Sequence, residues 1–94
     1  MARLTLKVRG ETGFNTEEAL AGFYEEEVEP RIRSLLLNGT AIISWKILPL
    51  HGPFDPSPKI AVEIEGPHID AFLPAIAKVL CREIAALYET ETVV

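Results

Sequence analysis

Two histidines and a cysteine are the residues best suited to binding a metal ion. His51 lies in the proline-rich segment LPLHGPFDPSP (48–58), and His68 follows Gly66-Pro67. Cys81 comes thirteen positions after His68. A zinc site needs three or four ligands, and zinc motifs place them at short fixed spacings. These three residues match no such spacing. We therefore predict neither a metal ion nor any other cofactor.

Nucleophilic catalysis needs a serine or cysteine beside a base. Ser34, Ser44 and Ser57 are the serines of the chain, and none stands in a Gly-x-Ser-x-Gly turn of the kind that exposes a nucleophile. Cys81 has no histidine near it in sequence. The sequence therefore assigns no catalytic residue and favours a protein that is not an enzyme.

The segment RGETGFNT (9–16) could present backbone amides to an anion at the start of a helix. After Arg9 no arginine follows until Arg31, whereas Glu11, Glu17 and Glu18 gather at this helix end. Their negative charges would repel a phosphate. We interpret the two glycines of the segment as turn residues.

The composition of the chain limits the kinds of protein that it can be. The chain has 94 residues, 48% of them hydrophobic, and a net charge of −5, which fits one globular domain over 1–94. No apolar run approaches the roughly 20 residues that span a bilayer, and the alternating start MARLTLKVRG does not resemble a signal peptide. A single cysteine fits a reducing compartment. We expect a small soluble cytoplasmic protein with no membrane partner, and the acidic balance speaks against general nucleic-acid binding.

The first half of the chain predicts a strand and a helix. ARLTLKVR (2–9) alternates apolar and polar residues, as a half-buried strand does. Asn15 is the expected N-cap of the helix that follows, with Glu18 completing a capping box. The apolar spacing continues past Pro30, so we predict one kinked helix that ends at Asn38-Gly39.

The second half predicts two strands, a helix and a short final strand. TAIISWKIL (40–48) and KIAVEIE (59–65) are rich in β-branched residues, and in the former Trp45 should face the core in phase with Ile43 and Ile47. The second helix covers 68–89, with Pro74 bending it or marking its start. Its inward face should hold Ile69, Phe72, Leu73, Ile76, Leu80, Ile84 and Leu87. An edge strand is expected over Thr90 to Val94.

The order β-α-β-β-α, with a possible final β, is that of the ferredoxin-like split βαβ arrangement. We therefore predict an α+β fold with an antiparallel sheet and two helices packed on one face. The first and third strands should be central neighbours. The open face would then present a basic group of Arg3, Lys7, Arg9 and Lys46, beside Glu63 and Glu65.

Single-stranded RNA is usually bound on such sheets by stacking bases on aromatic residues of the central strands. The predicted first and third strands contain no aromatic residue. We interpret the basic sheet face as solvated or oligomer-facing and expect no nucleic-acid partner.

Two regions suggest contact with another protein. Ala71, Ala75, Val79 and Ala86 widen the apolar surface of the second helix beyond one stripe, as in helices buried on more than one side. The proline-rich segment 48–58 is too long for a minimal hairpin turn and should form a stiff arm. We predict that Leu50, His51 and Phe54 of this arm, with Val79 and Ala86, contact a second copy or another partner.

The sequence thus favours a non-enzymatic interaction or assembly module that forms a homo-oligomer or joins a larger assembly. One alternative is a small enzyme or metabolite-binding regulatory domain whose site forms at a subunit interface, an analogy that rests on fold alone. A second alternative is nucleic-acid binding through the basic sheet face. The small-molecule ligand, if there is one, is unknown.

Overall fold

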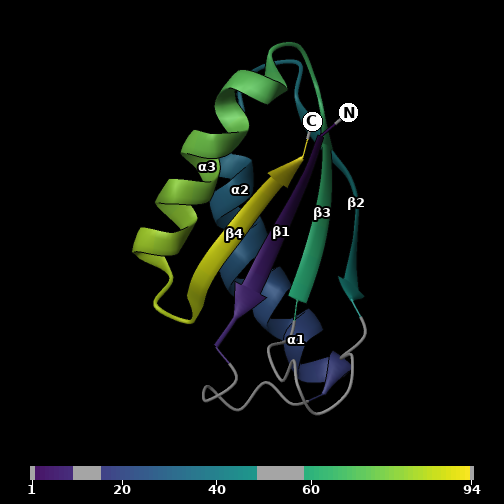
Figure 1. The fold of residues 1–94 in the computed structure, drawn as a ribbon. Coiled ribbons are helices and arrows are strands. Elements are labelled where there is room, and N and C mark those ends of the chain that lie inside the picture. Colours follow the sequence, from purple (N-terminus) through teal and green to yellow (C-terminus); the bar gives the residue numbers. More distant parts are fainter. Residues whose placement is uncertain (1, 10–15, 49–58, 94) are drawn as a thin grey trace.

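The computed structural model describes residues 2–9, 16–48 and 59–93. Within them the elements follow the order β-α-β-β-α-β (Figure 1). The bounds are β1 Ala2–Val8, α1 Glu17–Phe23, the π-helix η2 Tyr24–Val28, α2 Glu29–Leu35, β2 Ala41–Leu48, β3 Lys59–Glu65, α3 Ile69–Glu83 and β4 Leu87–Val93.

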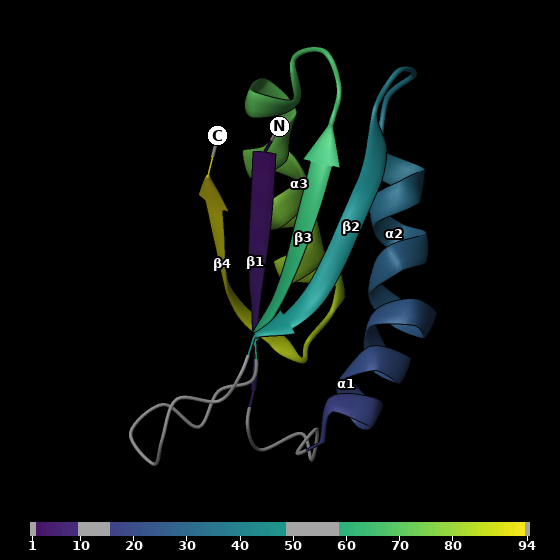
Figure 2. The ribbon, with the colours of Figure 1, turned by 90° about the vertical axis from the view of Figure 1, so that its right-hand side faces the viewer.

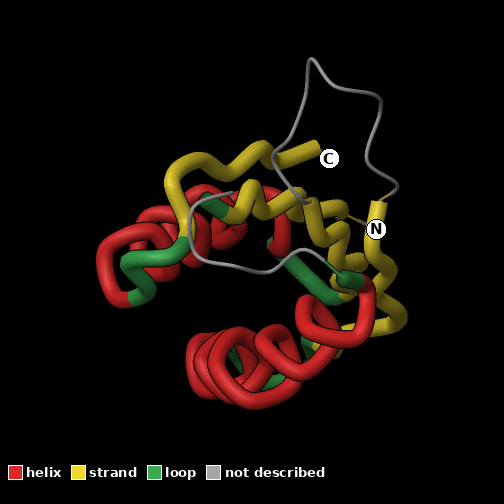
Figure 3. The backbone as a smooth tube through the Cα atoms, turned by 90° about the horizontal axis from the view of Figure 1, so that it is seen from below, coloured by secondary structure: helices red, strands yellow, loops and turns green. Residues whose placement is uncertain are grey.

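The four strands form one open sheet in the order β2-β3-β1-β4, and each neighbouring pair is antiparallel. The helices cover one face of the sheet (Figures 2 and 3), with α3 near β4 and β1 and the first helical run near β2. The expected α+β architecture with an antiparallel sheet is confirmed. The two edges of the sheet are β2 and β4.

The helical run 17–35 begins one residue later than expected. Its N-cap is Thr16, whose hydroxyl accepts a hydrogen bond from the Ala19 amide at 3.1 Å. The expectation of Asn15 as the cap was therefore wrong, and Asn15 itself lies outside the described residues. Glu17 and Glu18 occupy the first turn, where the helix dipole favours negative charge.

Pro30 does not end this helical run, which confirms that the helix continues past it, but the expected end at Asn38-Gly39 was wrong because α2 ends at Leu35 and Leu36 is already extended. The five residues before Glu29 form the π-helical turn η2, and the Glu29 amide donates to the Tyr24 carbonyl, five residues back. In a regular α-helix Pro30 would lack its hydrogen bond and clash with the carbonyl four residues earlier. The wider π turn accommodates it, and Arg31 donates from its guanidinium to the Glu27 carbonyl at 2.6 Å.

The second helix is shorter than expected. α3 ends at Glu83, Ile84 is already extended, and the Leu87 amide donates to the Ile84 carbonyl across a turn. Leu87 is buried, as expected, but as the first residue of β4. The expected final strand is thus present and starts three positions before Thr90. Pro74 lies inside the helix.

Strand β2 contains a bulge that changes which side chains face the core. Its pairing with β3 shifts between Ile42 and Ser44, so the extra residue Ile43 turns outward and is 48% exposed. Trp45 packs against the core as expected, together with Ile42 and Ile47. The prediction that Ile43 shares the phase of Trp45 was wrong, because a bulge interrupts the alternation of a strand.

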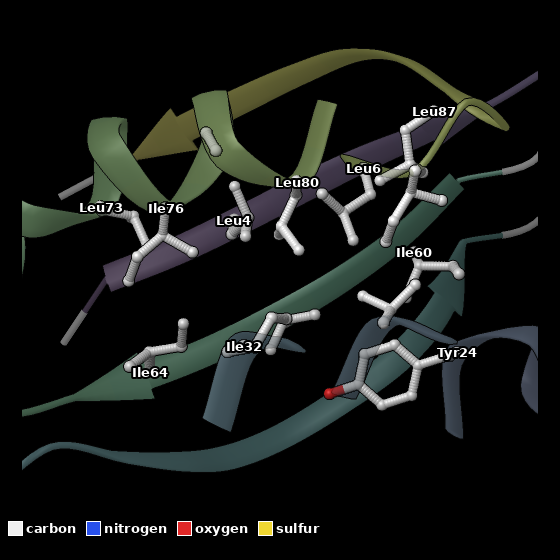
Figure 4. Close-up of a cluster of buried hydrophobic side chains, with 14 of the residues drawn as sticks. Leu4, Leu6, Tyr24, Ile32, Ile60, Ile64, Leu73, Ile76, Leu80 and Leu87 are labelled. Atoms are coloured by element: carbon white, nitrogen blue, oxygen red, sulfur yellow. The ribbon is translucent and has the colours of Figure 1, made fainter. Parts of the chain in front are cut away.

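The core lies between the sheet and the helices (Figure 4). Leu4 and Leu6 of β1 and Ile60 and Ile64 of β3 are fully buried. The helices cover them with further buried side chains, namely Tyr24, Ile32, Leu73, Ile76 and Leu80. Strand β2, in contrast, has no buried residue.

Candidate protein-interaction surface

The residues considered for metal binding do not come together in the part of the chain that the structure describes. No group of three or more histidine, cysteine, aspartate or glutamate side chains able to hold an ion is found among the described residues. His68 is exposed just before α3, with a left-handed backbone (φ 62°). Cys81 is a half-buried free thiol on α3, and His51 lies outside the described residues.

The basic sheet face is partly neutralised by its neighbours. The Lys7 ammonium lies 3.2 Å from the Glu91 carboxylate, and Arg9 donates from Nε to the Ala85 carbonyl at 3.0 Å. Arg3 is exposed and lies opposite Glu63 in the register of β1 and β3. Lys46 is exposed on β2, and among the described residues it has no ion pair.

The expected contact surface on the second helix has few large apolar side chains. Val79 and Ala86 are half-buried, and Ala86 packs against the core. The exposed apolar residues of α3 are small, such as Ala71 and Ala75. The other three predicted contact residues, Leu50, His51 and Phe54, lie outside the described residues.

A more apolar surface runs along the edge strand β2. Six of its eight residues are apolar, yet every residue of the strand is at least partly exposed. The apolar members are Ala41, Ile42, Ile43, Trp45, Ile47 and Leu48. Edge strands usually carry charges that discourage pairing with another chain, but Lys46 is the single charged residue of β2. We call this strand and its outer edge the β2 edge.

A second exposed apolar residue lies in the turn between α2 and β2. Leu37 is 52% exposed, and with Ile43 it is one of the two large apolar side chains that stand out as exposed in the described chain. A pocket of about 330 Å³ separates the end of α2 from the start of β2, lined by Arg33 and residues 36–42. The turn between them uses Gly39 with φ 87°, a conformation that glycine adopts without strain.

Trp45 is held in place at the centre of the β2 edge. Its ring stacks on Tyr24, with ring centroids 4.2 Å apart and an interplanar angle of 29°. Tyr24 is fully buried, so the stack joins the half-buried tryptophan to the core. The tryptophan is thus presented at the edge with a fixed position.

The hydroxyl of Tyr24 is an unusual buried group. It has no hydrogen-bond partner among the described residues. Burial, followed by the negative charge of Glu29, raises the pKa of Tyr24 above its ordinary value, and Arg33 opposes this shift. The hydroxyl therefore stays protonated across the physiological pH range.

The opposite edge of the sheet has a different character. β4 alternates glutamate and threonine in ETET (89–92). Beside it, an open pocket of about 290 Å³ lies between α3 and β4, lined by Pro74, Ala77, Lys78, Cys81, Thr90 and Thr92. This edge is thus both acidic and more polar than the β2 edge.

Reasoning from the sequence did not identify the β2 edge, although a signal for it was present. The predicted arrangement already placed the second strand at an edge of the sheet, and TAIISWKIL has one charge in nine residues. An exposed apolar strand at the edge of a sheet can pair with a strand of another chain. We instead weighed the apolar helix, whose exposed residues are mostly small in the structure.

A scan against protein-family models and a search of curated proteins each found no match for this chain. Among the helices of the described residues, none combines the length and the apolar character needed to cross a membrane.

Proposed function

We propose that this chain is a non-enzymatic assembly module that self-associates. The observation that carries the proposal is the β2 edge, an apolar edge strand with one charge and no buried residue. Unpaired backbone groups on such an edge accept a strand from another chain. Leu37, in the turn before β2, is a further exposed apolar residue.

The proposed fold class is the ferredoxin-like split βαβ class. The strand order β2-β3-β1-β4 and the two helices on one face support this assignment. Domains with this arrangement serve many functions, so the class alone does not select one. We also propose that the protein acts in the cytoplasm, because a single cysteine suits a reducing compartment.

The mass of the protein in solution tests the proposed function. Sedimentation velocity from low micromolar to near-millimolar concentration should show a species heavier than the 10.4 kDa chain, with a share that grows with concentration. A particle that keeps the mass of one chain over the whole range would refute self-association.

Two other functions have less support from the surface. Nucleic-acid binding would use Arg3, Lys7, Arg9 and Lys46, but Lys7 and Arg9 already contact Glu91 and the Ala85 carbonyl. A metabolite-binding or catalytic role at a subunit interface remains a proposal that rests on the fold class. A thermal-shift screen with metabolites and metal ions tests it, because a ligand that binds the folded state raises its melting temperature.

A further inference from the structure

We infer that two copies of this chain join by antiparallel pairing of their β2 strands, about a two-fold axis centred on Trp45. The inference rests on the proposed self-association and names its partner, surface and register. The two four-stranded sheets would become one continuous sheet, with the helices of both copies on the same face. Such an interface is self-complementary, as closed two-fold dimers require.

The charges of the two edges favour β2 over β4 for symmetric pairing. In ETET (89–92) two glutamates alternate with threonine along β4, so pairing this strand with its own copy brings acidic residues close together. Like charges directly opposite each other destabilise a sheet. The β2 edge has one lysine and no acidic residue, so it repels its own copy far less.

The register follows from the position of that lysine. In a two-fold pair of antiparallel strands, side chains of the same sheet face lie opposite each other only when one residue pairs with its own copy at the axis. Beyond the bulge, the described part of the strand allows Trp45, Lys46 or Ile47 to be this central residue. Centring on Lys46 sets two lysines face to face. Centring on Ile47 sets Lys46 against Leu48, whose β3 partner is Lys59. Centring on Trp45 sets Lys46 against Ser44, and this register alone avoids a second lysine.

The Trp45 register also supplies an opposite charge. Ser44 lies opposite Glu63 in β3 and donates a hydrogen bond to its carboxylate at 3.3 Å. Neighbouring strands are about 4.8 Å apart, so Lys46 of the second copy needs to cross only the short Ser44 to approach Glu63. Opposite charges in one row of a sheet stabilise the pairing. The two-fold axis makes this contact twice.

Trp45 is suited to the centre of the interface. It is half-buried in the single chain and already fixed by its stack on Tyr24, so little freedom is lost when it becomes fully covered. Tryptophan is also among the residues that contribute most to binding at protein interfaces. In the same register Ile47 of the second copy lies opposite position 43, where the bulge turns Ile43 outward.

A cycle of charge variants tests the register. Ser44→Lys should raise the dimer dissociation constant about tenfold, because it faces Lys46 of the second copy twice across the axis. The single chain should stay folded, since the new lysine lies beside Glu63. Lys46→Glu should weaken the dimer similarly. The double variant should recover it, because each new lysine then faces a new glutamate.

Cross-linking provides an independent measurement. In a Cys81→Ser background, a mixture of the Ser44→Cys and Lys46→Cys chains should form a disulfide between copies, whereas each chain alone should form little. Directly opposite residues of antiparallel strands have Cα atoms about 4.5–5.5 Å apart, within the range that a disulfide spans.

Lys78→Glu is the control for the charge variants. It makes the same charge change as Lys46→Glu, but on the exposed surface of α3, and should leave the mass of the dimer unchanged.

The outcomes separate the inference from the proposed function. A dimer that all β2 variants leave intact, or that Lys78→Glu or Ala75→Glu dissociates, overturns the β2 interface but keeps self-association. Masses that grow beyond two chains indicate head-to-tail pairing of β2 with β4 and also overturn it. A strict monomer refutes the proposed function itself. Loss in both single variants with recovery in the double supports the inference.

Discussion

At the scale of single residues, Tyr24 combines full burial with an unpartnered hydroxyl. A buried hydroxyl without a hydrogen bond costs about 1–3 kcal/mol of its hydration. Tyr24→Phe removes that hydroxyl and keeps the ring that stacks on Trp45. We therefore expect the free energy of unfolding to rise by about 1 kcal/mol, as measured by urea denaturation at neutral pH. A clear loss of stability would show that the hydroxyl does have a partner.

The same residue predicts a pH dependence. The pKa of Tyr24 is raised in the folded chain, so the folded state keeps its proton when the unfolded state loses it above about pH 10. Stability is therefore fully present below about pH 10 and falls as the pH rises, by at most about 1.4 kcal/mol per pH unit. Comparing urea unfolding of the wild type and Tyr24→Phe at about pH 9 and pH 11 isolates this effect. Equal losses in both proteins would contradict it.

Two glycines predict opposite effects of the same substitution. A Cβ at Gly66 would lie 2.7 Å from Thr40 Cα, because the start of β2 passes close to the end of β3. Gly66→Ala should therefore cost about 1–3 kcal/mol by overpacking. A Cβ at Gly22, inside α1, meets nothing within 4 Å, so Gly22→Ala should stabilise by about 0.5–1 kcal/mol. Thermal unfolding of the pair measures both, and a harmless Gly66→Ala would refute the close approach.

At the scale of elements, the first helical run depends on its start. Thr16 caps it through a hydrogen bond to the Ala19 amide, and replacing such a cap with alanine costs about 1 kcal/mol. Thr16→Ala should therefore lower the free energy of unfolding by about that amount, whereas Thr16→Ser should keep most of it. If the two variants are equally stable in urea denaturation, Thr16 is not the cap.

The sequence predicted the elements better than their ends. Period-two patterns identified β1 and β3, although burial in the structure is not restricted to one sheet face, since Thr5 and Ala61 are buried as well. The end of α3 was missed because Ile84 and Leu87 continue the helical spacing, yet they reach the core from a turn and from β4. Spacing alone does not separate these two routes to burial.

The bulge in β2 and the π turn were also missed, for a related reason. Both depend on neighbours distant in sequence or on backbone geometry, since the bulge appears only in the pairing of Ile42 and Ser44 with β3. Its consequence for the candidate surface is large, because it turns Ile43 outward. Trp45 was placed correctly by its phase with Ile47, although Ile43 does not share that phase, and its stack on Tyr24 appears only in three dimensions.

At the scale of the whole molecule, the two sheet edges differ in the charges that they carry. β4 alternates acidic and hydroxyl residues, and such a pattern discourages self-pairing. β2 is mostly apolar, and none of its residues is buried. The chain is therefore expected to form closed pairs through one edge, with the acidic edge limiting growth to two copies.

Hydrogen exchange at the backbone amides tests this account most directly. Amides that point away from β3 exchange freely in a single chain and become protected when a second β2 strand pairs with them. We predict that protection over residues 44–48 rises with protein concentration while protection along β4 stays constant. Concentration-dependent protection on α3 or β4, with none on β2, would contradict the β2 interface.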